Sequence, residues 1–472
     1  MIKFVGETSL QKMTSEQIQS VYFLGAGGIG MSALVRYYLH KKKKVAGYDR
    51  TETALTRQLR GEGADIHYDD SIENIPNYCL NNQTTLVVLT PAVPENHSEL
   101  CFFRKNGFVI IKRAQILSEI ANESKCICIA GTHGKTTTSS MTAHLFKQST
   151  LDCNAFLGGI LKNYDSNLLL SENGEFTVVE ADEYDRSFHW LKPYMAIITS
   201  CDPDHLDIYQ TPEAYYESFE KFTSLIRPNG SLIMKKGLKI TPQVGNDVKI
   251  YTYSTENTES DFYAENIRIE NGEIIFNFVT PNEKLADIQL GVPIRINIEN
   301  SIAAMASAWL NGITEDEIRK AVASFQGVER RFDFKLKTDK IVLIDDYAHH
   351  PDELRACISS VKELYPNRKI TGIFQPHLYS RTRDFAPEFA ESLSLLDEVV
   401  LTDIYPAREL PIPGVGSEII FDKITTSEKF ILSKNELLSF VAKHSFDVLL
   451  IMGAGDIDKF VQPVKEILES KK

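Results

Sequence analysis

The sequence predicts an α/β protein of three domains, each built around a mainly parallel sheet. Two glycine-bearing loops, at residues 25–30 and 131–134, follow short apolar runs, and each precedes a helical stretch. Strand-like and helix-like segments keep alternating through the last third of the chain, which is typical of parallel sheets. With 472 residues the chain also exceeds what one hydrophobic core usually holds.

Composition narrows the class of protein. Apolar residues make up 43% of the chain and charged residues 24%, as is ordinary for a globular protein. The net charge of −13 argues against nucleic acid or an anionic membrane as a general partner. The chain has neither a run of about 18 apolar residues nor an N-terminal signal-peptide core. Its cysteines are scattered without zinc-ligand spacing, so we expect a cytoplasmic protein with reduced thiols.

The first domain, expected over residues 1–119, has the β-α-β pattern of a Rossmann-like fold. A strand leads into the loop Gly-Ala-Gly-Gly-Ile-Gly, and the next strand ends at Asp49. Such a loop, with an acid about 20 residues later, binds the diphosphate of a nucleotide compound. The pattern alone leaves NAD, FAD and other nucleotide diphosphates open. The expected elements are strands at 21–24, 45–48, 86–89 and 109–111 and a helix at 31–39.

The second domain, expected over residues 120–328, is P-loop ATPase-like. A buried strand at 126–130 runs into the glycine loop 131–134, and a helix is expected from Thr138 onward. Unpaired backbone N–H groups at the start of a helix bind phosphate. In the general P-loop pattern a lysine reaches the β- and γ-phosphates and the next hydroxyl holds Mg²⁺, which assigns Lys135 and Thr136. The loop is a short variant, because Ile129 replaces the first glycine of that pattern.

Acidic residues follow two further strands of this domain. A strand at 176–179 leads into the acidic stretch 180–185, and Glu180, the first of these acids, is the expected Mg²⁺ ligand. A strand at 195–199 precedes a loop in which His205 lies among three acids, where it would ligate a second metal ion or contact phosphate. The remaining expectations are helices at 213–226 and 298–310 and an antiparallel flap of short strands at 229–290.

The third domain, expected over residues 329–472, is again Rossmann-like. The expected elements are strands at 341–344, 370–374, 399–401 and 448–452 and a helix at 353–364. Histidines and arginines follow the strands, where open α/β sheets bind ligands. They are His349, His350, His377, Arg381 and Arg383. An arginine of this kind can hold a carboxylate through two parallel hydrogen bonds.

These features together fit ATP-driven ligation of a carboxylate to an amine through an acyl phosphate. Phosphoryl transfer needs charge neutralisation and alignment, which Lys135, Mg²⁺ and an arginine would supply. An NAD-dependent oxidoreductase is the alternative from another enzyme class, but it leaves Lys135, Glu180 and His205 without a task. A nucleotide-binding scaffold without activity would be expected to lack some of these groups.

The chain resembles the Mur ligases of peptidoglycan synthesis. The matching stretches, in order, are GAGGIGMS, AGTHGKTTT, VEADEYDRSF, DPDHLD, VERRFDF, DDYAHHP, FQPHLYSRTRDF and IYPARELPIPG. DDYAHHP and FQPHLYSRTRDF are most similar to the branch that joins L-alanine to UDP-N-acetylmuramate. The nearest alternative is the recycling branch, which attaches a preformed tripeptide to the same UDP-sugar.

The resemblance also implies site residues. The ATP site would comprise Gly131, Thr132, His133, Gly134, Lys135, Thr136, Thr137, Asn297, Arg331 and Asp346. Thr136 and Glu180 would hold one Mg²⁺ and His205 a second. The UDP-sugar would bind at Gly27, Gly28, Ile29 and Asp49, and the amino acid at Tyr347, His349, His377 and Arg381. The expected catalytic residues are Lys135, His205 and Arg381.

Two positions depart from the usual family pattern. Ile296 stands where most members have a histidine before the adenine-contacting asparagine, here Asn297. Phe219 stands where several members have a carbamylated lysine. The alanine-adding branch is similar in lacking that lysine.

Overall fold

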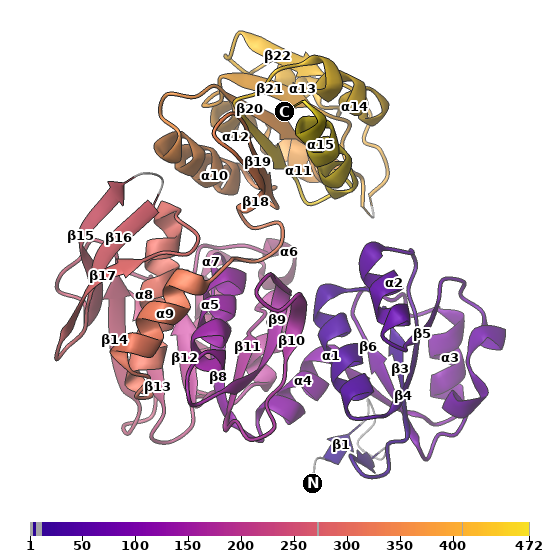
Figure 1. Cartoon of the computed structure of the whole chain (residues 1–472). Helices are drawn as coiled ribbons and strands as arrows, with labels where there is room; N and C mark the ends of the chain where they lie inside the picture. The colour runs from indigo at the N-terminus through magenta and orange to yellow at the C-terminus, as the bar shows by residue number, and fades with distance from the viewer. Residues whose placement is uncertain (1–2, 6–11, 271–272, 408, 472) are drawn as a thin grey trace. The chain divides into compact units, whose positions relative to one another are not determined.

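The computed structural model describes residues 3–5, 12–270, 273–407 and 409–471, which form an α/β protein (Figure 1). The chain divides into two compact units. The larger unit comprises Met1–Ile267, Ile275–Gly291 and Ile298–Gln326, and the smaller unit comprises Arg268–Ile274, Val292–Asn297 and Gly327–Lys472.

The N-terminal sheet is a five-stranded parallel sheet in the order β5-β4-β3-β6-β7. Its strands are β3 Ser20–Leu24, β4 Lys44–Tyr48, β5 Asp65–His67, β6 Thr85–Leu89 and β7 Val109–Lys112. Its helices are α1 Ile29–His40, α2 Ala54–Gly61, α3 Ser98–Lys105 and α4 Arg113–Ala121. The order in which strands are added to the sheet reverses between β3 and β6, and open parallel sheets bind ligands at such a switch point. The glycine loop after β3 lies there.

The central sheet has ten strands in the order β10-β9-β11-β8-β12-β13-β14-β15-β16-β17. They are β8 Lys125–Ala130, β9 Cys153–Leu161, β10 Ser166–Leu169, β11 Phe176–Glu180, β12 Met195–Ile198, β13 Ser231–Lys235, β14 Lys249–Ser254, β15 Phe262–Glu270, β16 Glu273–Val279 and β17 Lys284–Gln289. The expectation of an antiparallel flap at 229–290 is wrong for its first half. There β13 pairs with β12 and β14 in parallel, because its Leu232 and Ile233 are fully buried and extend the central core.

Helix α5, Lys135–Lys147, begins three residues earlier than the sequence predicts. Gly134 caps it in a left-handed conformation with φ of +80°, so the chain turns directly from the loop into the helix. Helix α5 packs on β8, β9 and β11 and against α9 (Figure 1). Other helices of this region are α6 Leu206–Tyr209, α7 Pro212–Thr223, α8 Arg295–Leu310 and α9 Glu315–Ser324.

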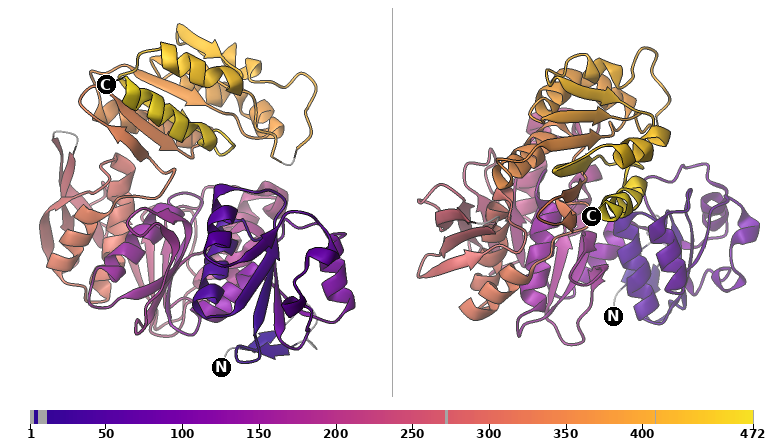
Figure 2. Two further views of the ribbon diagram at one scale, coloured as in Figure 1. Left: turned by 45° about the vertical axis from the view of Figure 1, so that its right-hand side comes forward. Right: turned by 45° about the horizontal axis from the view of Figure 1, so that its top comes forward.

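The smaller unit contains a six-stranded sheet in the order β18-β19-β23-β20-β21-β22, parallel except for the β18–β19 pair. The strands are β18 Asp333–Lys337, β19 Val342–Asp346, β20 Ile370–Phe374, β21 Glu398–Leu401, β22 Glu428–Ile431 and β23 Val448–Met452. The helices are α10 Pro351–Leu364, α11 Tyr379–Asp384, α12 Ala386–Leu393, α13 Glu418–Phe421, α14 Lys434–Lys443 and α15 Asp458–Ser470. Figure 2 shows helices on both faces of this sheet.

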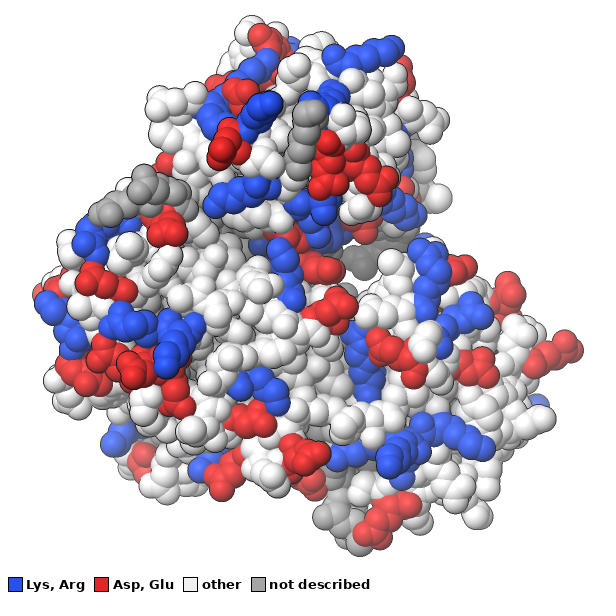
Figure 3. Space-filling model, in the orientation of Figure 1, with Lys and Arg blue, Asp and Glu red and all other residues white. Residues whose placement is uncertain are grey.

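The domain limits expected from the sequence stay a prediction. Residue 119 lies inside α4, and the next strand, β8, begins at Lys125. The limit at 328 lies two residues beyond Gln326, where the larger unit ends. Throughout the described ranges, every helix is too short or too polar to cross a bilayer. On the face shown in Figure 3, basic and acidic side chains are interspersed.

Candidate functional site

The loop between β8 and α5 has a shape that only glycine permits at two positions. Gly131 has φ of +143°, and a Cβ atom there would lie 2.8 Å from the backbone nitrogen of Ser200. Gly134 has φ of +80°, and a Cβ atom there would lie 2.9 Å from Oδ1 of Asn300. The two glycines therefore let the loop pack closely on Ser200 and Asn300 at the N-terminal end of α5, where backbone N–H groups can bind phosphate.

Side chains that follow β12 hold this loop. Ser200 Oγ accepts a hydrogen bond from the His133 amide at 2.7 Å, and Thr199 Oγ1 donates to the His133 carbonyl at 2.5 Å. Thr132 Oγ1 donates to the carbonyl of Asp202 at 2.6 Å and lies 2.8 Å from the Tyr215 hydroxyl. The sequence alone does not predict these partners. The signal that could have found Thr199 and Ser200 is that β12 and β8 are neighbouring parallel strands, whose ends must meet.

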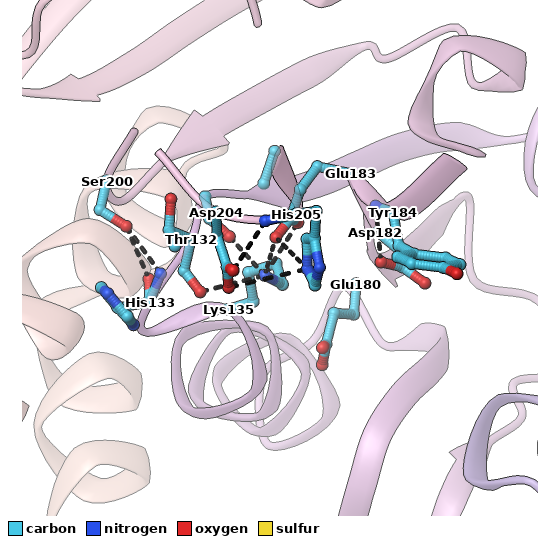
Figure 4. A network of polar contacts seen from close by, with 12 residues as sticks. Thr132, His133, Lys135, Glu180, Asp182, Glu183, Tyr184, Ser200, Asp204 and His205 are labelled. Atoms are coloured by element: carbon cyan, nitrogen blue, oxygen red, sulfur yellow. Dashed lines mark hydrogen bonds and ion pairs between the residues drawn. The ribbon is translucent and has the colours of Figure 1, made fainter. Parts of the chain in front are cut away.

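Lys135 is held inside the loop (Figure 4). Its Nζ donates to the Gly131 carbonyl at 2.5 Å and lies 2.8 Å from Oε2 of Glu183. Burial lowers the pKa of Lys135, but the carboxylates of Glu183 and Glu180 outweigh burial, and the pKa is raised overall. The ammonium is therefore charged at neutral pH. The Glu183 side chain is only 2% exposed, so it is a buried counterion for this lysine.

Glu180 lies beside the first turn of α5. The Thr136 hydroxyl donates to Glu180 Oε1 at 3.1 Å, and the Gly158 amide donates to Oε2 at 3.1 Å. The register of β11 on β8, which pairs Glu180 with Ile129, delivers the carboxylate to the loop. Hydroxyl and carboxylate oxygens suit Mg²⁺, which usually takes its other ligands from water and substrate phosphates. Among the described residues there is no group of three or more His, Cys, Asp or Glu side chains that could hold a metal ion.

His205 joins this group through Glu183. Its Nε2 atom is 3.9 Å from Glu183 Oε1 and 3.8 Å from Asp204 Oδ2, and its ring lies edge-on to Tyr184. Figure 4 shows Lys135, Glu183 and His205 turned toward one another. Of the acids at 180–185, the sequence predicts a role for Glu180. It does not predict one for Glu183, because burial of a residue beyond a strand end has no periodic signature.

A pocket of about 300 Å³ connects the N-terminal glycine loop to the central sheet. Gly28 and Ile29 line one wall, and Gly158 and Glu180 line the other. The structure thus brings residues expected at the UDP-sugar site together with the expected Mg²⁺ ligand. Gly27 and Asp49 shape the same loop, because the Gly27 amide donates to Asp49 Oδ2 at 2.7 Å.

Arg113, at the start of α4, also lines this pocket. Its Nη2 atom donates to Asp182 Oδ2 at 3.1 Å. A Cβ atom on Gly30 would lie 2.8 Å from Arg113 Nη1, so the missing side chain at Gly30 lets the guanidinium lie over the glycine loop. The sequence alone does not predict a role for Arg113. A guanidinium beside the glycine loop suits a diphosphate.

The remaining expected site residues belong to the smaller unit. Asp346 accepts hydrogen bonds from the amides of Phe332 at 2.7 Å and Ala348 at 2.8 Å, and burial raises its pKa. The Arg331 guanidinium lies 5.1 Å from the ring centroid of Tyr347, a cation–π contact. Asn297 is buried and donates from Nδ2 to the Val292 carbonyl at 3.2 Å.

The structure brings His349 and His377 together, with ring centroids 5.8 Å apart. Burial by itself would raise the pKa of Glu353, but His349 and Arg331 hold it well below its usual range. The Glu353 carboxylate accepts from the His349 amide at 3.0 Å, which fixes the loop before α10. Nearby in the sequence, Arg381 lies on α11, and its Nη1 atom is buried without a hydrogen-bond partner among the described residues. An unpaired buried guanidinium nitrogen suits a carboxylate ligand.

Models of protein families match three successive parts of the chain. The "Mur ligase family, catalytic domain" model matches residues 20–125, and the "Mur ligase middle domain" model matches residues 129–308. The "Mur ligase, glutamate ligase domain" model matches residues 330–455.

Curated relatives match over nearly the full length. The UDP-N-acetylmuramate–L-alanine ligase of Parabacteroides distasonis is 63% identical over 97% of this chain and 98% of its own length. The enzyme of the same name from Phocaeicola vulgatus is 58% identical over 97% of this chain and 100% of its own length.

Solved structures are similar as well. The crystal structure of UDP-N-acetylmuramate-alanine ligase from Thermotoga maritima has a TM-score of 0.82 and 28% identity, and the match covers 96% of this chain and 100% of that one. A murein peptide ligase from Psychrobacter arcticus has a TM-score of 0.69 and 22% identity, covering 95% of this chain and 98% of that one. At that identity the second likeness shows the fold alone.

Proposed function

This chain belongs to the Mur ligase family, and from that premise we propose that it joins L-alanine to the lactyl carboxylate of UDP-N-acetylmuramate with cleavage of ATP to ADP and phosphate. The observation that carries the proposal is sequence identity of 58–63%, over 97% of this chain, to two enzymes named UDP-N-acetylmuramate–L-alanine ligase. The phosphate loop, with its buried Lys135–Glu183 pair, supplies the chemistry that such a ligase requires.

The proposed reaction has two steps. A carboxylate oxygen of the sugar attacks the γ-phosphorus of ATP, the bond to the β,γ-bridging oxygen breaks, and ADP leaves. The amine of L-alanine then attacks the acyl carbon, loses a proton, and expels inorganic phosphate to leave an amide. In this proposal the Lys135 ammonium would contact the β- and γ-phosphates of a nucleotide held by the loop and balance their charge.

The metal site is part of the proposal. Thr136 and Glu180 would hold one Mg²⁺, because their oxygens lie within hydrogen-bonding distance beside the phosphate loop. His205 would serve a second ion on the side of Glu183. Bound Mg²⁺ would neutralise phosphate charge and help to align the γ-phosphoryl group.

The UDP-sugar would bind in the pocket between the glycine loop and the central sheet. The loop formed by Gly27, Gly28 and Ile29 and shaped by Asp49 would hold the diphosphate through its main chain, and Arg113 would balance its charge. Since Glu180 lines the other wall, this arrangement directs the sugar carboxylate toward the ATP-binding loop.

The proposed roles in the smaller unit are adenine contact by Asn297, ATP contact by Arg331 and Asp346, and amino-acid binding by Tyr347, His349, His377 and Arg381. For Arg381→Lys we expect the KM for L-alanine to rise about tenfold or more, because lysine cannot reproduce a two-pronged contact with a carboxylate. The KM values for ATP and UDP-N-acetylmuramate should stay unchanged in steady-state assays of phosphate release.

A matched control for this variant lies two residues along the same short helix. Arg383 is exposed and bonds through Nε to Asp384 at 2.7 Å. Arg383→Lys should leave all three KM values within about twofold, as for most surface changes. Equal effects of the two substitutions would remove Arg381 from the proposed amino-acid site.

The proposed function is tested by supplying UDP-N-acetylmuramate and ATP with either L-alanine or the tripeptide L-alanyl-D-glutamyl-diaminopimelate. We expect phosphate release and a mass gain of the UDP-sugar with L-alanine. Release with the tripeptide alone would assign the chain to the recycling branch. Binding of NADH, followed by fluorescence, would instead favour an oxidoreductase.

We place this activity in the cytoplasm. The reaction consumes ATP and a nucleotide-linked sugar, and the cysteines that the structure describes are all free thiols. The product would be a precursor of peptidoglycan, which makes the chain an enzyme of cell-wall synthesis.

A further inference from the structure

A buried asparagine connects the central sheet to the first helix of the chain. Asn167 lies in β10 and is 0% exposed. The antiparallel register of β10 on β9 shifts between Ser166 and Leu168, which is an irregularity of the β-bulge kind at Asn167. Such bulges redirect a side chain. Here the amide of Asn167 contacts α1.

Three hydrogen bonds join this side chain to α1. Asn167 Nδ2 donates to the Ile29 carbonyl at 2.7 Å and to Ser32 Oγ at 3.0 Å. Its Oδ1 atom accepts from Arg36 Nη1 at 2.5 Å. Arg36 is itself held by Glu62, with Nη2 3.0 Å from Oε1. The network therefore runs from the central sheet through α1 to the residue that follows α2.

The surroundings of this network are apolar. Leu34 and Tyr38 of α1 belong to the same buried hydrophobic cluster as Phe156 of β9 and Leu168 of β10. Apolar contacts alone tolerate small shifts of one surface over another, whereas buried hydrogen bonds require one arrangement. Asn167 thus fixes the position of α1 along β9 and β10.

That position determines the geometry of the sugar-nucleotide pocket. Ile29, whose carbonyl Asn167 holds, lines one wall. Phe156 and Gly158, on the strand paired with β10, line the opposite wall next to Glu180. We propose that Asn167, supported by Arg36, is a positioning residue that sets the glycine loop against the metal-binding wall of the pocket. This inference rests on the proposed function for the identity of the ligand.

The test is Asn167→Leu, which keeps the side-chain size and removes all three hydrogen bonds. We expect the KM for UDP-N-acetylmuramate to rise about 10- to 100-fold, because a shift of the glycine loop by about 1 Å would misalign the groups that bind this substrate. The KM for ATP should stay within about twofold. Hydrogen–deuterium exchange of the ligand-free protein should become faster in residues 29–36 of α1. This second readout does not depend on activity.

Asn154→Ala is the matched control. Asn154 lies on β9 of the same strand pair, but its Oδ1 atom accepts from the Ser171 amide at 2.9 Å and not from α1. It should change neither the KM for the UDP-sugar nor exchange in α1. Should Asn167→Leu fail to fold, Ser32→Ala, which removes one acceptor of Asn167, decides by the same two readouts.

Unchanged KM and unchanged exchange in a folded variant would overturn the proposal, as would an equal rise in the KM for all three substrates. Failure of the proposed function is distinguishable from either result. In that case the wild-type chain would show no phosphate release with L-alanine, and faster exchange of α1 in Asn167→Leu would still report the positioning role.

Discussion

Replacing Lys135 by methionine is expected to lower kcat by about 10³-fold or more. The ammonium donates hydrogen bonds to two carbonyls of the phosphate loop, and phosphoryl transfer depends on charge neutralisation in a water-poor site. The same change should lower the melting temperature, because Glu183 would remain buried without its counterion. Phosphate release and thermal unfolding measure the two effects separately.

A double variant separates chemistry from stability. In Lys135→Met with Glu183→Gln the unpaired buried charge is gone, so the melting temperature should recover toward the wild-type value while kcat stays low. Lys147→Met is the control at the other end of α5, where Nζ bonds Asp152 and the Leu170 carbonyl. Lys147→Met should lower the melting temperature and leave kcat within about twofold of the wild-type value. A Lys135→Met enzyme that kept a tenth of the wild-type kcat would contradict the proposed mechanism.

Replacing Glu180 by glutamine should lower kcat about 10²-fold and raise the Mg²⁺ concentration needed for half-maximal rate. The substitution keeps the shape of the side chain but removes the negative charge beside Thr136, and Mg²⁺ binds carboxylate oxygens far better than amide oxygens. The measurement is kcat as a function of free Mg²⁺ at saturating ATP.

The control for Glu180 lies at the opposite end of β11. Glu175 precedes that strand and pairs with Lys125 at 2.8 Å on the surface. Glu175→Gln should leave the Mg²⁺ dependence of kcat unchanged, because this ion pair lies at the end of β11 that is far from the phosphate loop. Its loss should also change stability little, since surface ion pairs contribute little to the free energy of unfolding. If both variants showed the wild-type Mg²⁺ dependence, Glu180 would not be a metal ligand.

Local sequence patterns predict the parts of the fold that depend on local chemistry. Buried strands such as β3 and β8 read as short apolar runs, and glycine loops mark their ends. The start of α5 is missed by three residues, because the cap is a left-handed Gly134 and not a polar side chain. The parallel pairing of β13 is missed because pairing direction depends on distant strands and leaves no mark within the segment.

The residues of the candidate site also fall into two groups, those that a local sequence pattern predicts and those that depend on distant segments. Lys135 and Thr136 are recognisable because they follow a strand at a characteristic spacing, and Glu180 because it is the last residue of an apolar strand. Glu183, Arg113 and Asn167 are not, since their roles arise from burial and from contacts across 48, 69 and 131–138 positions of sequence. Such long-range partners become visible only once the sheets are assembled.

The hydrogen bonds that fasten Thr132 and His133 to the end of β12 have an energetic consequence for nucleotide capture. Because the phosphate loop is ordered during folding, the entropic cost of ordering it does not have to be met when ATP binds. What remains for the incoming triphosphate is to draw the Lys135 ammonium from one anionic partner to another. We therefore expect ATP to bind to a preformed loop, with the exchange of the Lys135 counterion as the main local change.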